Sequence, residues 1–405
     1  MSNSADETMV QPTVKRAKLG EAENKDRLSD LPDCVILHIL SFLNTEKAVQ
    51  TCVLSSRYKD LWKHLPALIL HSYSCDFPTV KVFTKFVSRV LSLRDSSIPL
   101  QSLHFGYIGS LDPQLIKGVA NYAISYDIQR LGLSVYCDIE QLPPSIFSCK
   151  TITYLDLSIY PIGYGRKTVF PKSFNMPALT TLNLGNFDFC ASDNNSRAEP
   201  FSVFNRLNTL VLRQCGMRDT LTLCISSVTL VNITVHSHSY EFYEIELCTP
   251  NLGTFAFIGK PYQKVSGSGL SYVKHVDIDA EILSTDMQPP QFLLSWLLQL
   301  VNTKSLTVTA STLQVLFLNA NLLKIKLPSL GNLKFLKVKK ELLPYVFLKA
   351  LNEAKLQKIK SPKEAAKLQK SFEAGLEPSA PIPDGIVEFL IQNSPLAEVE
   401  IIDCT

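Results

Sequence analysis

The sequence lacks long hydrophobic runs and an excess of charge of either sign. A membrane-spanning helix needs about 20 consecutive apolar residues, and the longest apolar candidate, "FLLSWLLQLV" at 292–301, is far shorter. The net charge is only +3 over 405 residues, and the basic residues form no stripe of the kind that nucleic-acid binders carry. The opening residues are polar, so we expect no secretory signal, no membrane partner and no nucleic-acid partner.

Motifs for metal, cofactor and catalytic chemistry are also missing. None of the ten cysteines forms a C-x-x-C pair, which favours reduced thiols over disulfides or structural zinc. His236 and His238 in "VHSHSY" have no acidic or thiol partners at metal-site spacing. "VSGSGLSY" around Gly267 lacks the third glycine and the following helix that a phosphate loop needs. We therefore expect no metal, no cofactor and no catalytic residues.

The chain divides by composition into five segments. Residues 1–25 are polar and charged, which is typical of a disordered tail. Lys15, Arg16 and Lys18 cluster there and are similar to a short nuclear import signal, so we expect the protein in nucleus and cytoplasm. An ordinary solvated charge cluster is the alternative reading of these three residues.

Residues 26–70 predict a small module of three short helices. Pro32 suits an opening helical turn, and Ile36, Ile39, Leu40 and Leu43 follow at helical spacing. "NTEKAVQTCVL" and "SSRYKDLWKHL" supply two further amphipathic segments. About 40 residues have little interior in which to bury so many apolar side chains, so we expect part of that surface to remain available for a partner.

Residues 71–340 carry a repeat. Copies of L-x-x-L-x-L begin at residues 100, 128, 152, 179 and 207, and looser copies begin at 228, 252, 273, 303, 333 and 396. The copies are 21 to 30 residues apart, except for a gap of 63 before the last. Such a period is typical of leucine-rich repeats, in which each unit gives one strand to a curved parallel sheet. We predict an α/β fold, with Leu182 and Leu184 pointing inward; an irregular α/β fold is the alternative.

Two further segments follow the repeats. Residues 341–384 predict a charged helical insertion and a Pro-rich connector, and residues 385–405 predict a helix and a closing strand. If the solenoid forms, a partner protein would meet the outward side chains of its strands. The candidates are His104, Arg130, Asp156, Asn183, Arg213, His275, Asp277 and Lys337.

The stretch 26–62, "DRLSDLPDCVILHILSFLNTEKAVQTCVLSSRYKDLW", resembles an F-box. The matching positions include Leu31, Pro32, Ile36, Ile39, Leu40, Leu43, Val53 and Trp62. Downstream, "LPPSIFSCKTITYLDLS" and "FNMPALTTLNL" resemble plant F-box proteins with leucine-rich repeats and a terminal FBD-type region. Tyr58 stands where that family usually has tryptophan, and the FBD match is weak.

The resemblance implies a non-catalytic substrate receptor of a ubiquitin ligase. Its F-box would dock on a Skp-type adaptor, which joins a cullin scaffold, and its repeats would hold an unknown protein substrate. The eight matching residues above would supply the adaptor contact. The alternative is a repeat scaffold whose F-box is vestigial or works outside a ligase.

Overall fold

The computed structural model describes residues 30–72, 77–163, 165–191, 196–281, 288–319, 322–341, 345–357, 359, 361–373 and 382–404. The tail 1–25, with Lys15, Arg16 and Lys18, lies outside the described residues. So does most of the Pro-rich connector, residues 374–381.

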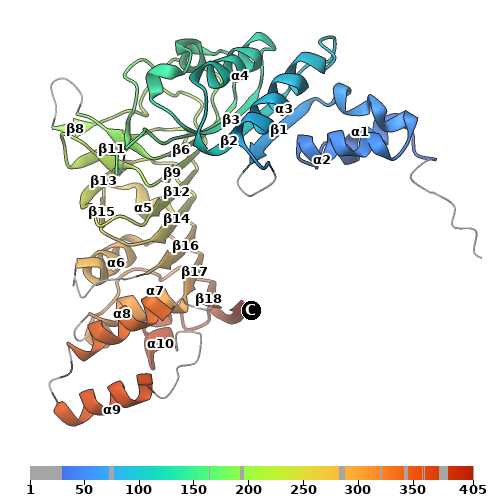
Figure 1. Ribbon diagram of the computed structural model, residues 1–405. Helices are drawn as coiled ribbons and strands as arrows, with labels where there is room; N and C mark the ends of the chain where they lie inside the picture. The colour runs from blue at the N-terminus through green and yellow to red at the C-terminus, as the bar shows by residue number, and fades with distance from the viewer. Residues whose placement is uncertain are drawn as a thin grey trace, which may run out of the picture.

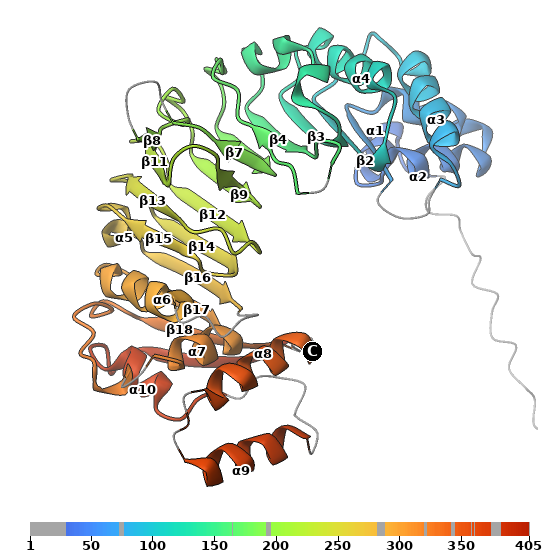
Figure 2. The ribbon, with the colours of Figure 1, turned by 60° about the vertical axis from the view of Figure 1, so that its left-hand side comes forward.

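One parallel sheet runs through the molecule and lines the inner side of an arc (Figures 1 and 2). Each strand joins the next in sequence order, apart from short strands that form separate outer sheets. The predicted α/β solenoid is therefore confirmed. Its strands are β1 (Ala67–Ser72), β2 (Ser102–Ser110), β3 (Arg130–Tyr136), β4 (Tyr154–Ile159), β6 (Thr181–Gly185), β9 (Thr209–Arg213), β12 (Asn232–Ser237), β14 (Thr254–Gly259), β16 (His275–Ala280), β17 (Ser305–Thr309), β18 (Phe335–Glu341) and β19 (Glu398–Cys404).

The outer side of the arc changes in kind along the chain. Helices cover it near both ends, whereas short strands cover the middle, in a three-stranded sheet β10-β7-β5 and a four-stranded sheet β15-β13-β11-β8. The helices are α3 (Val80–Leu93), α4 (Pro113–Ser125), α5 (Gly269–Tyr272), α6 (Gln288–Gln299), α7 (Ala310–Phe317), α8 (Tyr345–Leu356), α9 (Pro362–Glu373) and α10 (Ile386–Ile391). The outer strands are β5 (Thr168–Val169), β7 (Phe187–Phe189), β8 (Arg197–Ala198), β10 (Gly216–Met217), β11 (Thr222–Ser226), β13 (Tyr243–Cys248) and β15 (Gln263–Ser266). Short 3-10 turns η4 (Ile139–Gln141), η5 (Pro144–Ser148) and η6 (Leu322–Lys324) complete the layer.

The repeat motif works because its three apolar positions face the space between the layers. Leu179, Leu182 and Leu184 are fully buried, as the alternation predicted. The loose copy placed at 228 is wrong by two residues: Val228 is exposed, and β12 follows a repeat that begins at the buried Leu230. The correct register of this copy is L-x-x-I-x-V. The motif was misplaced because isoleucine and valine stand where L-x-x-L-x-L has leucine.

A twelfth copy of the motif begins at Leu65, inside the segment that sequence reasoning assigned to the helical module. "LPALIL" forms β1, the edge strand that pairs in parallel with β2. The boundary expected at residue 70 thus falls within a strand of the solenoid.

The helical module comprises α1 (Asp33–Leu40), α2 (Thr45–Gln50) and three 3-10 turns, η1 (Thr51–Val53), η2 (Ser56–Lys59) and η3 (Leu61–His64). Its third predicted helix is thus split into η2 and η3. The module lies against the free edge of β1, where the hydroxyl of Thr45 accepts the Ile69 amide proton at 2.8 Å. Arg94, at the C-cap of α3, donates from its guanidinium to the carbonyl of Leu65 at 3.2 Å. Its buried side chains are continuous with the core of the repeats.

The last repeat contains the predicted insertion. Helices α8 and α9 occupy it, and α10 then begins after Gly385, whose φ of 74° suits glycine. β19 closes the sheet by pairing with β18. None of the helices in the described ranges has the length and apolar character to cross a bilayer.

Candidate functional site

Among the described residues of the helical module, six large apolar side chains are exposed to solvent. Four lie on or just after α1, and two lie at the junction of η1 and η2. The most exposed are Phe42 (73%), Val53 (83%) and Leu54 (68%). We define the F-box apolar surface as Val35, Ile39, Phe42, Leu43, Val53 and Leu54.

Three of the residues expected to contact an adaptor face the interior instead. Ile36, Leu40 and Trp62 are at most 6% exposed and belong to the protein's own core. They therefore shape the module rather than offer surface, and Leu31 is half-buried against the same core. The reason is helical geometry: residues 36 and 40 share the inner face of α1, whereas residues 35 and 39 share the outer one.

An ion pair fixes the start of α1. The guanidinium of Arg57, on η2, lies 2.6 Å from the carboxylate of Asp33 and also donates to the carbonyl of Leu31. Asp33 occupies the first turn of α1, where a carboxylate interacts favourably with the helix dipole. Pro32 is exposed at the helix N-cap position. These contacts hold the N-terminal end of the F-box apolar surface in place.

A second candidate region lies on the inner face of the solenoid, where strand register aligns residues of equal offset in the motif. His104, Gly132, Asp156 and Asn183 occupy neighbouring positions across β2, β3, β4 and β6. Arg213 lies two residues further along its strand, β9, beside Gly185. Arg130 lies two residues before Gly132 on β3. Five of the eight predicted substrate residues thus come together: His104, Arg130, Asp156, Asn183 and Arg213.

Asp156 is the centre of this group. Its two carboxylate oxygens each lie 3.3 Å from Nη1 of Arg213, and Nδ2 of Asn183 donates to one of them at 3.1 Å. The same amide reaches the hydroxyl of Tyr154 at 3.0 Å, and Arg130 stacks 4.2 Å above that ring. Asn183 is only 5% exposed, so it holds Asp156 and Tyr154 in place instead of facing solvent as expected.

Burial lowers the pKa of His104, and the nearby Asp156 carboxylate only partly opposes that effect. The imidazole lies over Gly132, where a β-carbon would overlap its Nδ1 atom. Glycine at this position therefore makes room for the ring. At neutral pH the group contains two guanidinium groups, one carboxylate and a neutral imidazole.

The other three predicted substrate residues lie far along the sheet, among carboxylates. Lys339 on β18 contacts Asp277 on β16 at 3.2 Å, and Lys337 contacts Glu400 on β19 at 2.8 Å. His275 is exposed at the start of β16. This C-terminal group joins Asp277, Asp279, Glu281, Glu341, Glu398 and Glu400 with Lys337 and Lys339, so its net charge is negative.

Burial raises the pKa of Asp279, against the effect of a hydrogen bond from Thr309 at 3.1 Å. His238 lies 3.0 Å from the carboxylate of Glu281. No group of three His, Cys, Asp or Glu side chains suited to a metal ion occurs in the part of the chain that the structure describes.

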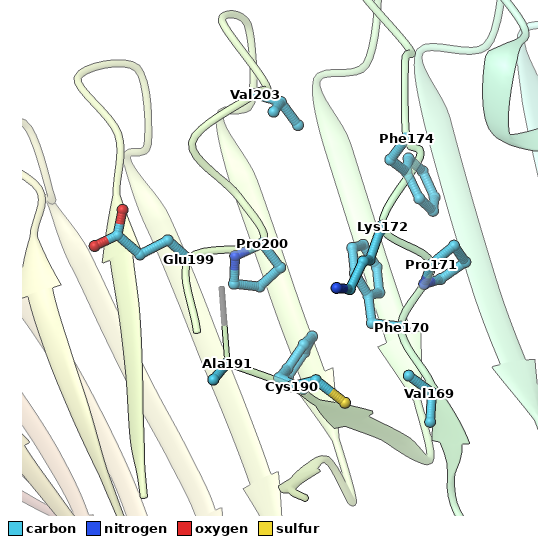
Figure 3. Close-up of a pocket in the computed structure, with 11 residues that line it drawn as sticks. Val169, Phe170, Pro171, Lys172, Phe174, Cys190, Ala191, Glu199, Pro200 and Val203 are labelled. Carbon is cyan, nitrogen blue, oxygen red and sulfur yellow. The ribbon is translucent and has the colours of Figure 1, made fainter. Parts of the chain in front are cut away.

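The outer layer contains a separate pocket of about 260 Å³ (Figure 3). Its walls are more apolar than polar and include Phe170, Phe174 and Val203. Figure 3 shows the amine of Lys172 reaching across it and the side chain of Glu199 turned away. Polar groups therefore do not converge inside this pocket, and its chemistry specifies no ligand.

Sequence reasoning missed several residues that shape both regions. Val35, Phe42 and Leu54 belong to the F-box apolar surface, and Tyr154 and Ser158 belong to the inner face. A signal was present for the latter pair, because they occupy the second and sixth residues after the first apolar position of their repeat. Reading all repeats at those offsets would have aligned them with Arg130 and Arg213.

The structure defines a repeat protein with a small helical module on the first edge of its sheet. The family model of the F-box domain matches residues 28–70, which is that module. The chain therefore carries an F-box domain followed by repeats.

Relatives in Arabidopsis thaliana carry F-box and LRR-repeat in their names. The chain is 32% identical over 231 residues to a relative of the F-box/FBD/LRR-repeat group, 28% over 270 residues to an F-box/LRR-repeat protein, and 26% over 329 residues to an F-box/FBD/LRR-repeat protein. These alignments cover 56%, 63% and 75% of this chain and 51%, 68% and 69% of the relatives. The chain thus spans about half the length of the first. The predicted resemblance to the plant F-box/leucine-rich-repeat family is confirmed.

Proposed function

We propose that this protein is a substrate receptor of a cullin-based ubiquitin ligase. Its F-box docks on a Skp-type adaptor, which joins the cullin scaffold, and the inner face of the repeats holds a protein substrate. The observation that carries the proposal is the F-box apolar surface, which leaves six large side chains in water on a module that the family model matches. Exposed apolar side chains in such number mark a site for another protein.

The size of the effect can be bounded from Phe42. Aromatic side chains bury roughly 150–250 Å² each, and 73% of this one is still available. At about 25 cal/mol per Å² its burial would stabilise a complex by at most about 5 kcal/mol, since association costs offset part of that gain. Phe42 alone could therefore decide whether an adaptor complex survives purification.

In this proposal the protein performs no bond chemistry. It would raise the effective concentration of substrate lysines near a ubiquitin-charged enzyme. The F-box is fixed to β1 by the Thr45 contact and a shared core, so the substrate would be presented in a defined orientation.

The test compares two double variants of the full chain. Phe42→Asp/Val53→Asp places charges on the F-box apolar surface, and Val228→Asp/Leu396→Asp places them on equally exposed apolar side chains of the repeats. We expect the first pair alone to abolish co-purification of a Skp-type adaptor, with unchanged circular dichroism for both. The ligase function fails if the unaltered chain never retains an adaptor, and the scaffold alternative then stands.

We also propose a nuclear and cytoplasmic location, carried by the basic cluster in the tail. Replacing Lys15, Arg16 and Lys18 with alanine should shift a fluorescent fusion toward the cytoplasm. An unchanged distribution would show that the cluster is only a solvated group of charges.

A further inference from the structure

The inner face of the solenoid is hollowed near its F-box end, with a volume of about 240 Å³. Four small residues occupy the same register position on adjacent strands, namely Gly106, Ser134, Ser158 and Gly185. We define the concave hollow by the residues around this floor: His104, Gly132, Ser134, Asp156, Ser158 and Arg213. A space of this size holds one large side chain, not a folded surface.

A hydroxyl on the floor of the concave hollow has no partner among the described residues. Ser158 is only 8% exposed, and its hydroxyl makes no hydrogen bond within the described part of the chain. The hydroxyl lies over Gly185, where a β-carbon would overlap it. Because the hydroxyl opens onto the concave hollow, it can donate its proton to a ligand acceptor that enters there in place of water.

Arg213 offers more donors on the same side. Only its Nη1 atom contacts Asp156, so the Nε–Nη2 edge has no partner among the described residues. That edge is the part of a guanidinium that binds a carboxylate with two parallel hydrogen bonds. Arg130, at the other end of the group, stacks on Tyr154 and has no carboxylate partner in the described ranges.

Charge favours an anionic ligand at this end of the sheet. Two guanidinium groups face one carboxylate, and Asp156 already accepts from Arg213 and Asn183. Burial lowers the pKa of His104, so the imidazole is uncharged at neutral pH and adds no charge to the group. The C-terminal group opposite is net negative and would repel the same ligand.

We propose that the concave hollow binds the side-chain carboxylate of an aspartate or glutamate in an extended substrate segment. The carboxylate would pair with the free edge of Arg213 and accept a hydrogen bond from Ser158. A phosphoryl group, with nearly twice the charge, fits less well because the Asp156 carboxylate borders the same space. This inference rests on the proposed function, since it names the substrate feature that the receptor would recognise.

The test uses three pools of short peptides, random except for a central glutamate, glutamine or phosphoserine. Binding of the full chain, purified with its adaptor, is measured on each pool. One charged hydrogen bond lost corresponds to about a tenfold change in affinity for a defined peptide. We expect the unaltered chain to prefer the glutamate pool over both others, and single peptides recovered from it to show a preference of that size.

Two variants and a matched control decide the site. Arg213→Gln removes the guanidinium, and Ser134→Phe fills the concave hollow without touching a charge. Both should lose the preference for glutamate, whereas Arg206→Gln, at an exposed arginine in the loop before β9, should keep it. Thermal unfolding checks that each variant is folded.

The outcomes separate this inference from the ligase function. A glutamate-to-glutamine ratio near one for the unaltered chain, or a preference that survives in both variants, overturns the proposal. A stronger response to phosphoserine overturns the choice of carboxylate. Adaptor co-purification is measured on the same samples: its absence beside an intact glutamate preference would refute the ligase function and leave the binding site standing.

Discussion

The contact between the F-box and the sheet can be tested with a single hydroxyl. Thr45 is 1% exposed, and its Oγ1 accepts the backbone proton of Ile69 at 2.8 Å. Ile69 lies on the edge strand β1, where this amide has no neighbouring strand to pair with. Thr45→Val keeps the shape of the side chain but removes the acceptor.

We expect this change to destabilise the junction by about 1–3 kcal/mol, the cost of leaving one buried backbone donor unsatisfied. Packing contributes little to the loss, because valine and threonine differ mainly in the hydroxyl. Thr45→Ser is the matched control, since it retains the acceptor and loses one methyl group.

Native-state hydrogen exchange measures the effect at the residue concerned. Protection of the Ile69 amide should fall by roughly tenfold to a hundredfold in Thr45→Val, given about 1.4 kcal/mol per factor of ten. Amides of β12, in the middle of the sheet, should keep their protection. If Ile69 exchanges at the same rate in the valine variant as in the unaltered chain, the hydrogen bond does not hold the F-box to the solenoid.

Three further predictions concern buried groups. Trp62→Ala should lower the free energy of unfolding by about 3–5 kcal/mol in urea titrations, because the indole lies in the core; an unchanged midpoint would contradict that placement. Burial raises the pKa of Cys215 to about 12, so iodoacetamide at pH 8 should label the exposed Cys34 in the native protein and Cys215 only after unfolding, as read by mass spectrometry. Burial lowers the pKa of His104 below its ordinary value of 6.5, so the unfolded chain binds more protons below that pH. Stability should therefore fall as the pH drops below about 6.5, and His104→Gln should weaken that dependence in urea titrations on either side of it.

The fold was readable from the sequence because burial imposes a strict spacing on leucine. Leu182 and Leu184 alternate with polar neighbours, and the same pattern at ten other places placed most strands correctly. The first strand was missed because Leu65 follows the F-box directly and looks like the end of its last helix. The copy at residue 228 was misplaced because Ile233 and Val235 replace leucine.

The candidate sites were less readable, since neighbours in a solenoid come from different repeats. The positions of Asp156 and Arg213 within their repeats showed that both side chains point away from the core, but not that they would contact each other. That contact depends on the register between β4, β6 and β9. The register cannot be read from the sequence, because the loops between these strands differ in length. In the F-box, the spacing of apolar residues did not reveal whether Trp62 would be buried or exposed, because the adjacent solenoid supplies part of its surroundings.

The continuous sheet also fixes the distance between the F-box and each position on the inner face. Neighbouring strands lie about 4.8 Å apart, so β4, three places from β1, lies about 14 Å along the sheet from the F-box edge. β18, ten places away, lies about 48 Å along it. The order of hydrogen-bonded strands is continuous from β1 to both positions. A substrate bound near β4 and one bound near β18 would thus present different parts of their surface beside the F-box. The number of strands between the F-box and the binding position would decide which substrate lysines lie close to the ubiquitin-charged enzyme.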